Sequence, residues 1–301
     1  MSTSSAPQSP SSVPDELPDF ASDEFPYGVG RITGADGHVE YSTYDVGSAL
    51  AILEAGTEQG DPFDVVRLTD EQIIGLDGFR RAQVTATPWV GQEEKLRPVL
   101  AAAGLRSLIA SDMVTIAVDE ESGATRWLVD PQINGCLVLR RTADVMCSAE
   151  RQVNGETGEQ IHRFYYYVHA EGVLEEEVSA SGMHYFRSMP AEAVPARIAL
   201  FVDQNQAASE GGEEHAVDPS TLTEDSELAQ RLADARAVTI LSALHADTES
   251  VKQMIMYATT TELFLLEPSE AEGDDAGQTV VRTIDSEQLL SVAAWLIEWD
   301  G

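Results

Sequence analysis

Histidine and cysteine are the residue types with which this sequence could bind a metal ion. His162 and His169 are seven residues apart in the run IHRFYYYVH, and an odd separation directs two side chains of one strand to opposite faces. His184 stands alone on its predicted strand, and neither CxxC nor HxxH spacing occurs. Cys136 and Cys147 are too few for a disulfide framework and predict buried thiols in a reduced compartment. We therefore expect no metal and no cofactor.

Carboxylates could supply a general acid and a general base, and the run Glu175, Glu176 and Glu177 is the clearest candidate. On a strand only Glu175 and Glu177 share a face, and no partner acid or base is identifiable, so the run predicts a solvated acidic face. No Ser, Cys or Lys lies in a nucleophile motif. We expect that the protein is not an enzyme, although catalytic groups drawn from distant residues keep an enzyme of unrecognised class as an alternative.

Nucleotide and nucleic-acid binding have weak candidates. The aromatic run Tyr165–Tyr167 could stack on bases, but such a strand is more typical of a core when no basic cluster flanks it. Gly28 and Gly30 lack the preceding apolar strand of a dinucleotide fingerprint. The chain carries 52 acidic against 18 basic residues, a formal charge of −34, which repels phosphates and anionic membrane surfaces. We expect no nucleic-acid partner and no membrane insertion.

The N-terminal segment sets an expectation for location. Residues 1–26 are rich in Ser and Pro with several acids, which predicts a disordered acidic tail. This segment has neither the positive n-region nor the apolar h-region of a secretory signal. No apolar run approaches the ~18 residues of a membrane span. The sequence therefore predicts a cytoplasmic protein.

Residues 27–144 predict a helical region with a small β-hairpin. A helix is expected over Asp45–Ala55, ended by Gly56, and a capping box at Thr69 opens another. A further helix is expected over Glu93–Ala103, closed by Gly104. Two short strands around a Gly-containing turn follow within residues 111–131. Helices followed by a hairpin predict a winged-helix-like arrangement.

An internal repeat organises the second half. Residues 185–203 align without a gap with residues 280–298, at an offset of 95, and each copy reads as a strand, a turn and an amphipathic helix. The runs upstream of both copies have the alternating, β-branched character of an antiparallel meander. We expect a first β-rich repeat at 145–203, an acidic linker and helix at 204–236, and a second β-rich repeat at 237–301. The predicted fold class is α+β, with two pseudo-symmetric antiparallel units, each closed by a helix, forming one sheet or two packed sheets.

Three stretches carry a resemblance to a known family: LTDEQIIGL, the middle block LRPVLAAAGLRSLIASDMVTIAVDEESGATRWLVDPQINGCLVL, and the paired closures RSMPAEAVPARIALF and RTIDSEQLLSVAAWL. Their order resembles the EspG family, cytosolic chaperones of type VII (ESX) secretion in actinobacteria. The resemblance covers about residues 65–299. It implies two quasi-symmetric β-rich halves, no catalytic residues and a helical secretion substrate of the PPE type as protein partner.

The resemblance also implies a binding site on the hairpin loops of the two repeats. The candidate contact residues are Asn154, Gly155, Glu156, Thr157, Gly158 and Glu159 in the first repeat, with Asp247, Thr248, Glu249 and Ser250 as their counterpart. Plain hairpin turns remain an alternative for both loops. An immunity-type or regulatory acidic binding protein, which blocks a basic partner by charge, remains an alternative for the function.

Overall fold

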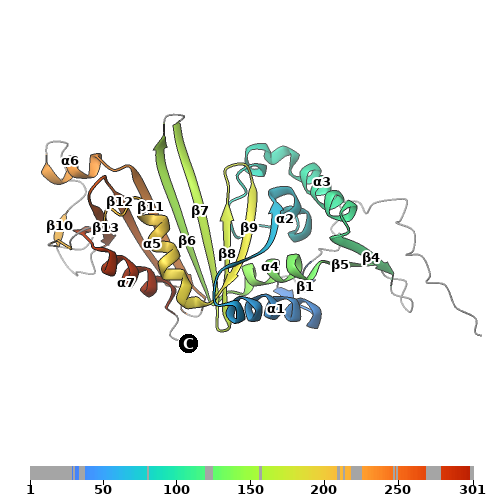
Figure 1. Cartoon of the computed structure of the whole chain (residues 1–301). Helices are drawn as coiled ribbons and strands as arrows, with labels where there is room; N and C mark the ends of the chain where they lie inside the picture. Colours follow the sequence, from blue (N-terminus) through green and yellow to red (C-terminus); the bar gives the residue numbers. More distant parts are fainter. Residues whose placement is uncertain are drawn as a thin grey trace, which may run out of the picture.

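The computed structural model describes most of the chain (Figure 1). The described residues are 29, 31–33, 38–79, 81–118, 125–155, 158–208, 211–212, 214–217, 226–246, 248, 250–268 and 279–298. The predicted tail over residues 1–26 lies outside them.

One sheet of ten strands is the centre of the fold, and every neighbouring pair in it is antiparallel. In spatial order the strands are β10 (His215–Val217), β14 (Thr279–Thr283), β13 (Leu263–Pro268), β12 (Ser250–Ala258), β11 (Ala237–His245), β6 (Val145–Gly155), β7 (Gly158–His169), β8 (Gly172–Val178), β9 (Met183–Met189) and β3 (Phe63–Thr69). Together with the helices this confirms the α+β class.

Each predicted repeat forms a four-stranded meander followed by a helix. Strands β6 to β9 precede a short 3₁₀ turn, Ala191–Ala193, and α5 (Val194–Val202), whereas β11 to β14 precede α7 (Ser286–Ile297). The helical stretch 191–202 and the helix 286–297 therefore begin and end at positions that are 95 residues apart. Strands β6 and β11 pair at the middle of the sheet, so the strand order counted outward is the same in both directions. Superposition of the two units stays a prediction.

The core lies on both faces of the sheet. Helices α5 and α7 contact each other and cover one face, where they pack on Tyr166, Leu241 and their neighbours (Figure 1). On the opposite face Tyr165 and Tyr167 pack with side chains of α1 and α4. All three tyrosines are buried, which confirms that the aromatic run belongs to the core.

The N-terminal helices begin and end at different residues from those expected. Helix α1 spans Thr43–Gln59, because Ser42 is the N-cap and Asp45 is the acid that completes the capping box. It runs through Gly56, where a Cβ would lie 2.2 Å from Ser188 Oγ of β9. This glycine therefore permits close packing on the sheet, and the helix ends at Gly60 with φ 73°.

Helix α2 begins where the sequence predicted, whereas the helix expected after it differs in its bounds. Helix α2 (Asp70–Asp77) begins with the predicted capping box at Thr69. The expected Glu93–Ala103 helix is instead a 3₁₀ segment, Val90–Leu96, followed by α3 (Arg97–Ala110). Gly104 lies inside α3 and does not end it. A Cβ there would be 2.1 Å from the Glu71 carbonyl oxygen, so the glycine permits the close contact between α3 and α2. A glycine at a helix–helix contact was thus mistaken for a helix stop.

The remaining elements surround this framework. Helix α4 (Pro131–Thr142) lies against α1, and the predicted hairpin is present as β4 (Val114–Val118) and β5 (Thr125–Val129). Two short strands, β1 (Arg31–Thr33) and β2 (His38–Glu40), form a separate pair. The segment expected to be an acidic linker and helix contributes α6 (Glu227–Ala233) and also the edge strand β10.

Candidate protein-binding surface

The hairpin of β6 and β7 carries the first predicted contact loop. Its ladder continues to the pairs Asn154↔Glu159 and Gly155↔Gly158, and residues 156 and 157 between them lie outside the described part. The ladder between β7 and β8 begins only at Arg163↔Val178, so the end of the hairpin extends past β8 (Figure 1). A protruding hairpin is an accessible element on which a partner can dock.

The second predicted loop lies at the other end of the sheet. Strands β6 and β11 pair antiparallel, with Val153 opposite Ala237 and Val145 opposite His245. Hence the turn that joins β11 to β12 lies beside the start of β6, where the Ala246 amide donates to the Asp144 carbonyl at 2.9 Å. Within that turn Thr248 is exposed, and residues 247 and 249 lie outside the described part. The structure therefore does not bring the two predicted loops together.

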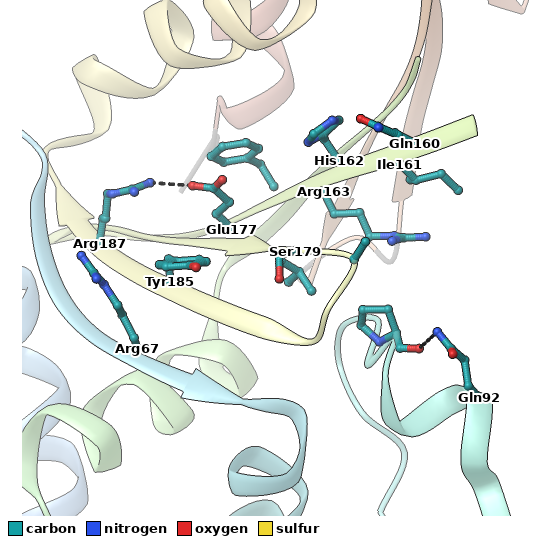
Figure 2. A pocket seen from close by; sticks show the side chains of 14 residues that line it. Arg67, Gln92, Gln160, Ile161, His162, Arg163, Glu177, Ser179, Tyr185 and Arg187 are labelled. Carbon is teal, nitrogen blue, oxygen red and sulfur yellow. Dashed lines mark hydrogen bonds and ion pairs between the residues drawn. The ribbon is translucent and has the colours of Figure 1, made fainter. Parts of the chain in front are cut away.

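A cleft of about 790 Å³ lies beside the base of the β6–β7 hairpin (Figure 2). It lies between strands β7, β8 and β9 and the segment that precedes α3. Its lining residues are Arg67, Pro88, Gln92, Gln160, Ile161, His162, Arg163, Phe164, Glu177, Val178, Ser179, Ala180, Tyr185 and Arg187. The sequence analysis predicted the hairpin but not the cleft beside it. On β9 every second side chain is buried, which is a local sign that the others, among them Tyr185 and Arg187, face outward.

The cations of this cleft are all bound to acidic side chains. Arg187 donates to Glu177 at 3.1 Å and to Asp64 at 3.0 Å. Arg67 donates to Asp64 at 3.2 Å and lies over the ring of Tyr185, 5.5 Å from its centroid. The arginines lower the pKa of the Asp64 carboxyl through these hydrogen bonds. With its charges compensated, the cleft offers polar and aromatic contacts to a protein surface.

Arg163, on the hairpin side of the cleft, forms an ion pair with Glu150 within the described part of the chain. Its Nε lies 3.5 Å from Glu150 Oε2. That Nε is buried and makes no hydrogen bond in the described part of the chain. Arg163 thus contributes a compensated charge to the hairpin side of the cleft.

A second cleft of about 810 Å³ lies in the other unit. It is bordered by β12, β14 and α7. Arg282, which matches Arg187 at the offset of 95, lies 3.6 Å from Glu267, much as Arg187 binds Glu177. The aromatic wall differs, because Trp295 of α7 lines this cleft under Lys252, whose Nζ is 4.2 Å from the ring centroid.

The acidic run predicted to be solvated is mostly buried. Glu175 and Glu176 are 0% exposed, and only Glu177 reaches solvent. Glu175 accepts from Arg197 of α5 at 2.5 and 2.6 Å and from Arg187 at 3.0 Å, so it fixes the closing helix to the sheet. As expected, Glu175 and Glu177 share a face, since both bind Arg187.

Glu176 belongs to a buried ionic cluster on the opposite face. It accepts from Arg140 at 3.0 Å, from the Tyr167 hydroxyl at 2.5 Å and from His184 Nδ1 at 2.5 Å. His184 Nε2 donates in turn to Asp70 at 2.6 Å. His184, which the sequence left alone on its strand, thus lies between two carboxylates.

The protonation of this cluster follows from its contacts. Burial lowers the pKa of His184, but its hydrogen bonds to Asp70 and Glu176 outweigh burial and raise that pKa. Burial raises the pKa of Glu176, yet Arg140 and His184 together bring it down to about 2. His184 therefore joins two carboxylates, and both contacts favour the protonated ring.

Acid–base residue types alone do not make this cluster an active site. All four charged side chains are at most 1% exposed, and the remaining oxygen of Asp70 accepts from the Trp89 and Val90 amides. The hydrogen bonds of the cluster join α2, α4, β8 and β9, so the cluster stabilises the fold. Among the described residues, no group of three His, Cys, Asp or Glu is placed to hold a metal ion.

The cysteines and the helices give two further findings. Cys136 and Cys147 are buried free thiols, and burial raises the pKa of both. No helix in the described ranges is long and apolar enough to cross a membrane.

Of three comparisons with known proteins, the one with solved structures found a similar protein. No protein-family model matches the chain, and no curated protein sequence does. Among solved structures, the chain is similar to the EspG5 chaperone of the Mycobacterium tuberculosis type VII secretion system, solved in complex with a PE25–PPE41 dimer. The TM-score is 0.50 at 10% sequence identity, over 79% of this chain and 99% of that one. At this identity the likeness establishes a shared fold.

Proposed function

We propose that this chain is a protein-binding chaperone that holds a type VII secretion substrate, and that it has no catalytic activity. The observation that carries the proposal is the fold likeness to a chaperone of that system, which spans 99% of the chaperone chain. That chaperone was solved with a PE–PPE dimer, so the substrate proposed here is a helical pair of the same kind.

Two features of the site support binding rather than turnover. The cluster of Asp70, Arg140, Glu176 and His184 is buried and occupied by its own hydrogen bonds. The open cleft instead carries arginines neutralised by Glu177, Asp64 and Glu150. Such a surface matches the compensated polar rim of a protein interface.

We place the contact on the β6–β7 hairpin together with the cleft at its base. The hairpin turn and Gln160 to Phe164 of β7 are continuous along one strand, so a partner that touches the turn reaches the cleft as well. The turn between β11 and β12 is excluded from this contact, because it lies at the far end of the sheet. We also propose that the two meanders arose from one unit, which the helical stretches at the offset of 95 support.

Co-expression with a PE–PPE pair from the same host tests the proposal. We expect one stable complex on size exclusion, weakened at least tenfold by Glu156→Arg with Glu159→Arg. The control reverses two exposed charges of α1, Glu54→Arg with Glu58→Arg, and leaves the complex intact. Recovery of the chain alone, or capture of a basic toxin instead, would overturn the proposal, and the second result would support an immunity function.

A further inference from the structure

One face of the second meander carries exposed apolar side chains on β11 and β12, whereas Phe264 and Val281 on the same side of β13 and β14 are buried. Along β11 the odd-numbered residues are buried and the even-numbered ones face outward. Ile240 is 42% exposed, Leu244 is 47% exposed, and Val251 of β12, directly opposite Leu244, is 65% exposed. We define the open face as Val238, Ile240, Ser242, Leu244, Val251, Gln253, Ile255, Tyr257 and Leu266, which the strand registers place on this side.

The composition of the open face sets it apart from the rest of the surface. None of its side chains is charged, although the whole chain has a net charge of −34. The nearest charge on the same side is Glu150 of β6, opposite Ile240, and it lies against Arg163. A contiguous apolar area on a highly charged protein marks an interaction site.

The other half of the sheet shows what covers this face. There α1 lies on β8 and β9, and α4 packs beside it, so that Leu174, Val178 and Phe186 are buried. On the second meander the described residues supply only α6, whose Arg231 lies over Phe264 at 4.9 Å and binds Glu262. Helices are thus the layer that this face accepts within the same molecule.

The dimensions fit a single helix. Three strands at about 4.8 Å spacing give a width of about 10 Å, and four outward rows at about 6.7 Å intervals give a length of about 20 Å. An α-helix is about 10 Å across and rises 1.5 Å per residue, so about 13 residues cover that length. A second copy of this chain is a poor occupant, because two bodies of charge −34 repel each other.

We propose that the open face binds one amphipathic helix of a partner protein, with an uncharged apolar stripe and basic flanks. The stripe matches the open face, and the basic flanks match the chain's net charge of −34. Insofar as that partner is the secretion substrate, the inference rests on the proposed function. It adds a second contact, on the other half of the molecule from the hairpin and its cleft.

The test uses a synthetic 18-residue helix with a leucine stripe and lysine flanks, labelled for fluorescence anisotropy. We expect saturable binding that Leu244→Asp with Val251→Asp weakens at least tenfold. Leu96→Asp with Val99→Asp is the matched control, because these side chains are 47% and 65% exposed on another surface. A scrambled peptide of the same composition measures attraction by charge alone.

Cross-linking then locates the peptide. Ser242 lies at the middle of the open face, and Cys136 and Cys147 are buried, so Ser242→Cys accepts a single photoreactive label in the folded protein. We expect this label to capture the peptide helix. Equal binding of the scrambled peptide, equal loss in the control variant, no saturable binding, or a dimer abolished by the paired Asp variant would each overturn the inference.

The same variants separate this inference from the proposed function. If a PE–PPE complex survives Leu244→Asp with Val251→Asp while the peptide is lost, the function stands and the assignment of the open face to that substrate fails. If no PE–PPE protein binds but the peptide still docks on the open face, the function fails and the open face remains a helix-binding site.

Discussion

The two halves of the sheet share their strand order but differ in what lies on one face. In the first half, α1 and α4 cover that face, and the buried cluster of Asp70, Arg140, Glu176 and His184 joins α2 and α4 to β8 and β9. In the second half the corresponding strands present the open face to solvent. A repeated strand framework therefore does not impose a repeated layer of helices; that layer depends on segments from outside the repeat.

The largest expected effect comes from breaking the buried cluster. Glu176→Leu leaves Arg140 and His184 buried without their shared carboxylate, and we expect a loss of about 3–5 kcal/mol in unfolding free energy. Urea unfolding followed by circular dichroism measures it. Ser242→Leu on the open face is the counterpart and should change stability by no more than about 0.5 kcal/mol. Similar losses in both variants would show that the two halves do not differ in this way.

Glycine contacts come next. Gly135 of α4 would place a Cβ 2.5 Å from Ile52 Cδ1 and 2.6 Å from the Ser48 carbonyl oxygen. We expect Gly135→Ala to cost about 1–3 kcal/mol, because the two helices are forced apart. Gly91→Ala, with nothing within 4 Å of its Cβ, is the control and should be close to neutral in a thermal melt. A neutral Gly135→Ala would mean that the helix layer adjusts freely.

The pH dependence of stability sharpens the comparison. The raised pKa of His184 contributes stability that is complete below its ordinary value of 6.5 and lost as pH rises through the raised pKa. The pKa of Glu176, lowered from 4.5 to about 2, contributes stability present above pH 4.5 and lost as pH falls toward 2. We expect His184→Gln to flatten the alkaline limb of stability against pH. If the stability of His184→Gln falls with rising pH as in the unchanged protein, the raised pKa of His184 is contradicted.

The smallest thermodynamic effect is expected on the open face. Leu244→Lys should change unfolding free energy by about 0.5 kcal/mol or less, because the side chain is already 47% exposed. The same substitution should reduce the fluorescence of the apolar dye ANS, since it interrupts the apolar area. Leu96→Lys, at equal exposure, provides the comparison. Equal dye signals in the two variants would argue against a contiguous apolar area.

Local signals predicted much of this fold. The capping box at Thr69, the hairpin over residues 111–131 and the two closing helices all depend on residues close in sequence. The repeat also predicted two meanders and allowed a single sheet. It could not predict that β3 and β10, from outside the repeat, form the edges of that sheet.

The parts that sequence reasoning missed depend on distant partners. Glu175 and Glu176 are buried because Arg197 and Arg140, 22 and 36 residues away, neutralise them. His184 meets Asp70 across 114 residues. Charged side chains are buried only when paired, and no local pattern reveals a pair at such separations. The same limit explains why the cleft beside the hairpin was not anticipated.

The bond between Asp70 and His184 also bears on synthesis. At about 5–20 residues per second, the 114 residues that separate these side chains take roughly 6 to 23 seconds to be translated. Helix α1, which packs on β8 and β9, is therefore synthesised well before those two strands exist. The N-terminal helices must therefore persist as an unassembled, partly apolar nascent segment, and the translation rate of the host will influence the yield of folded protein.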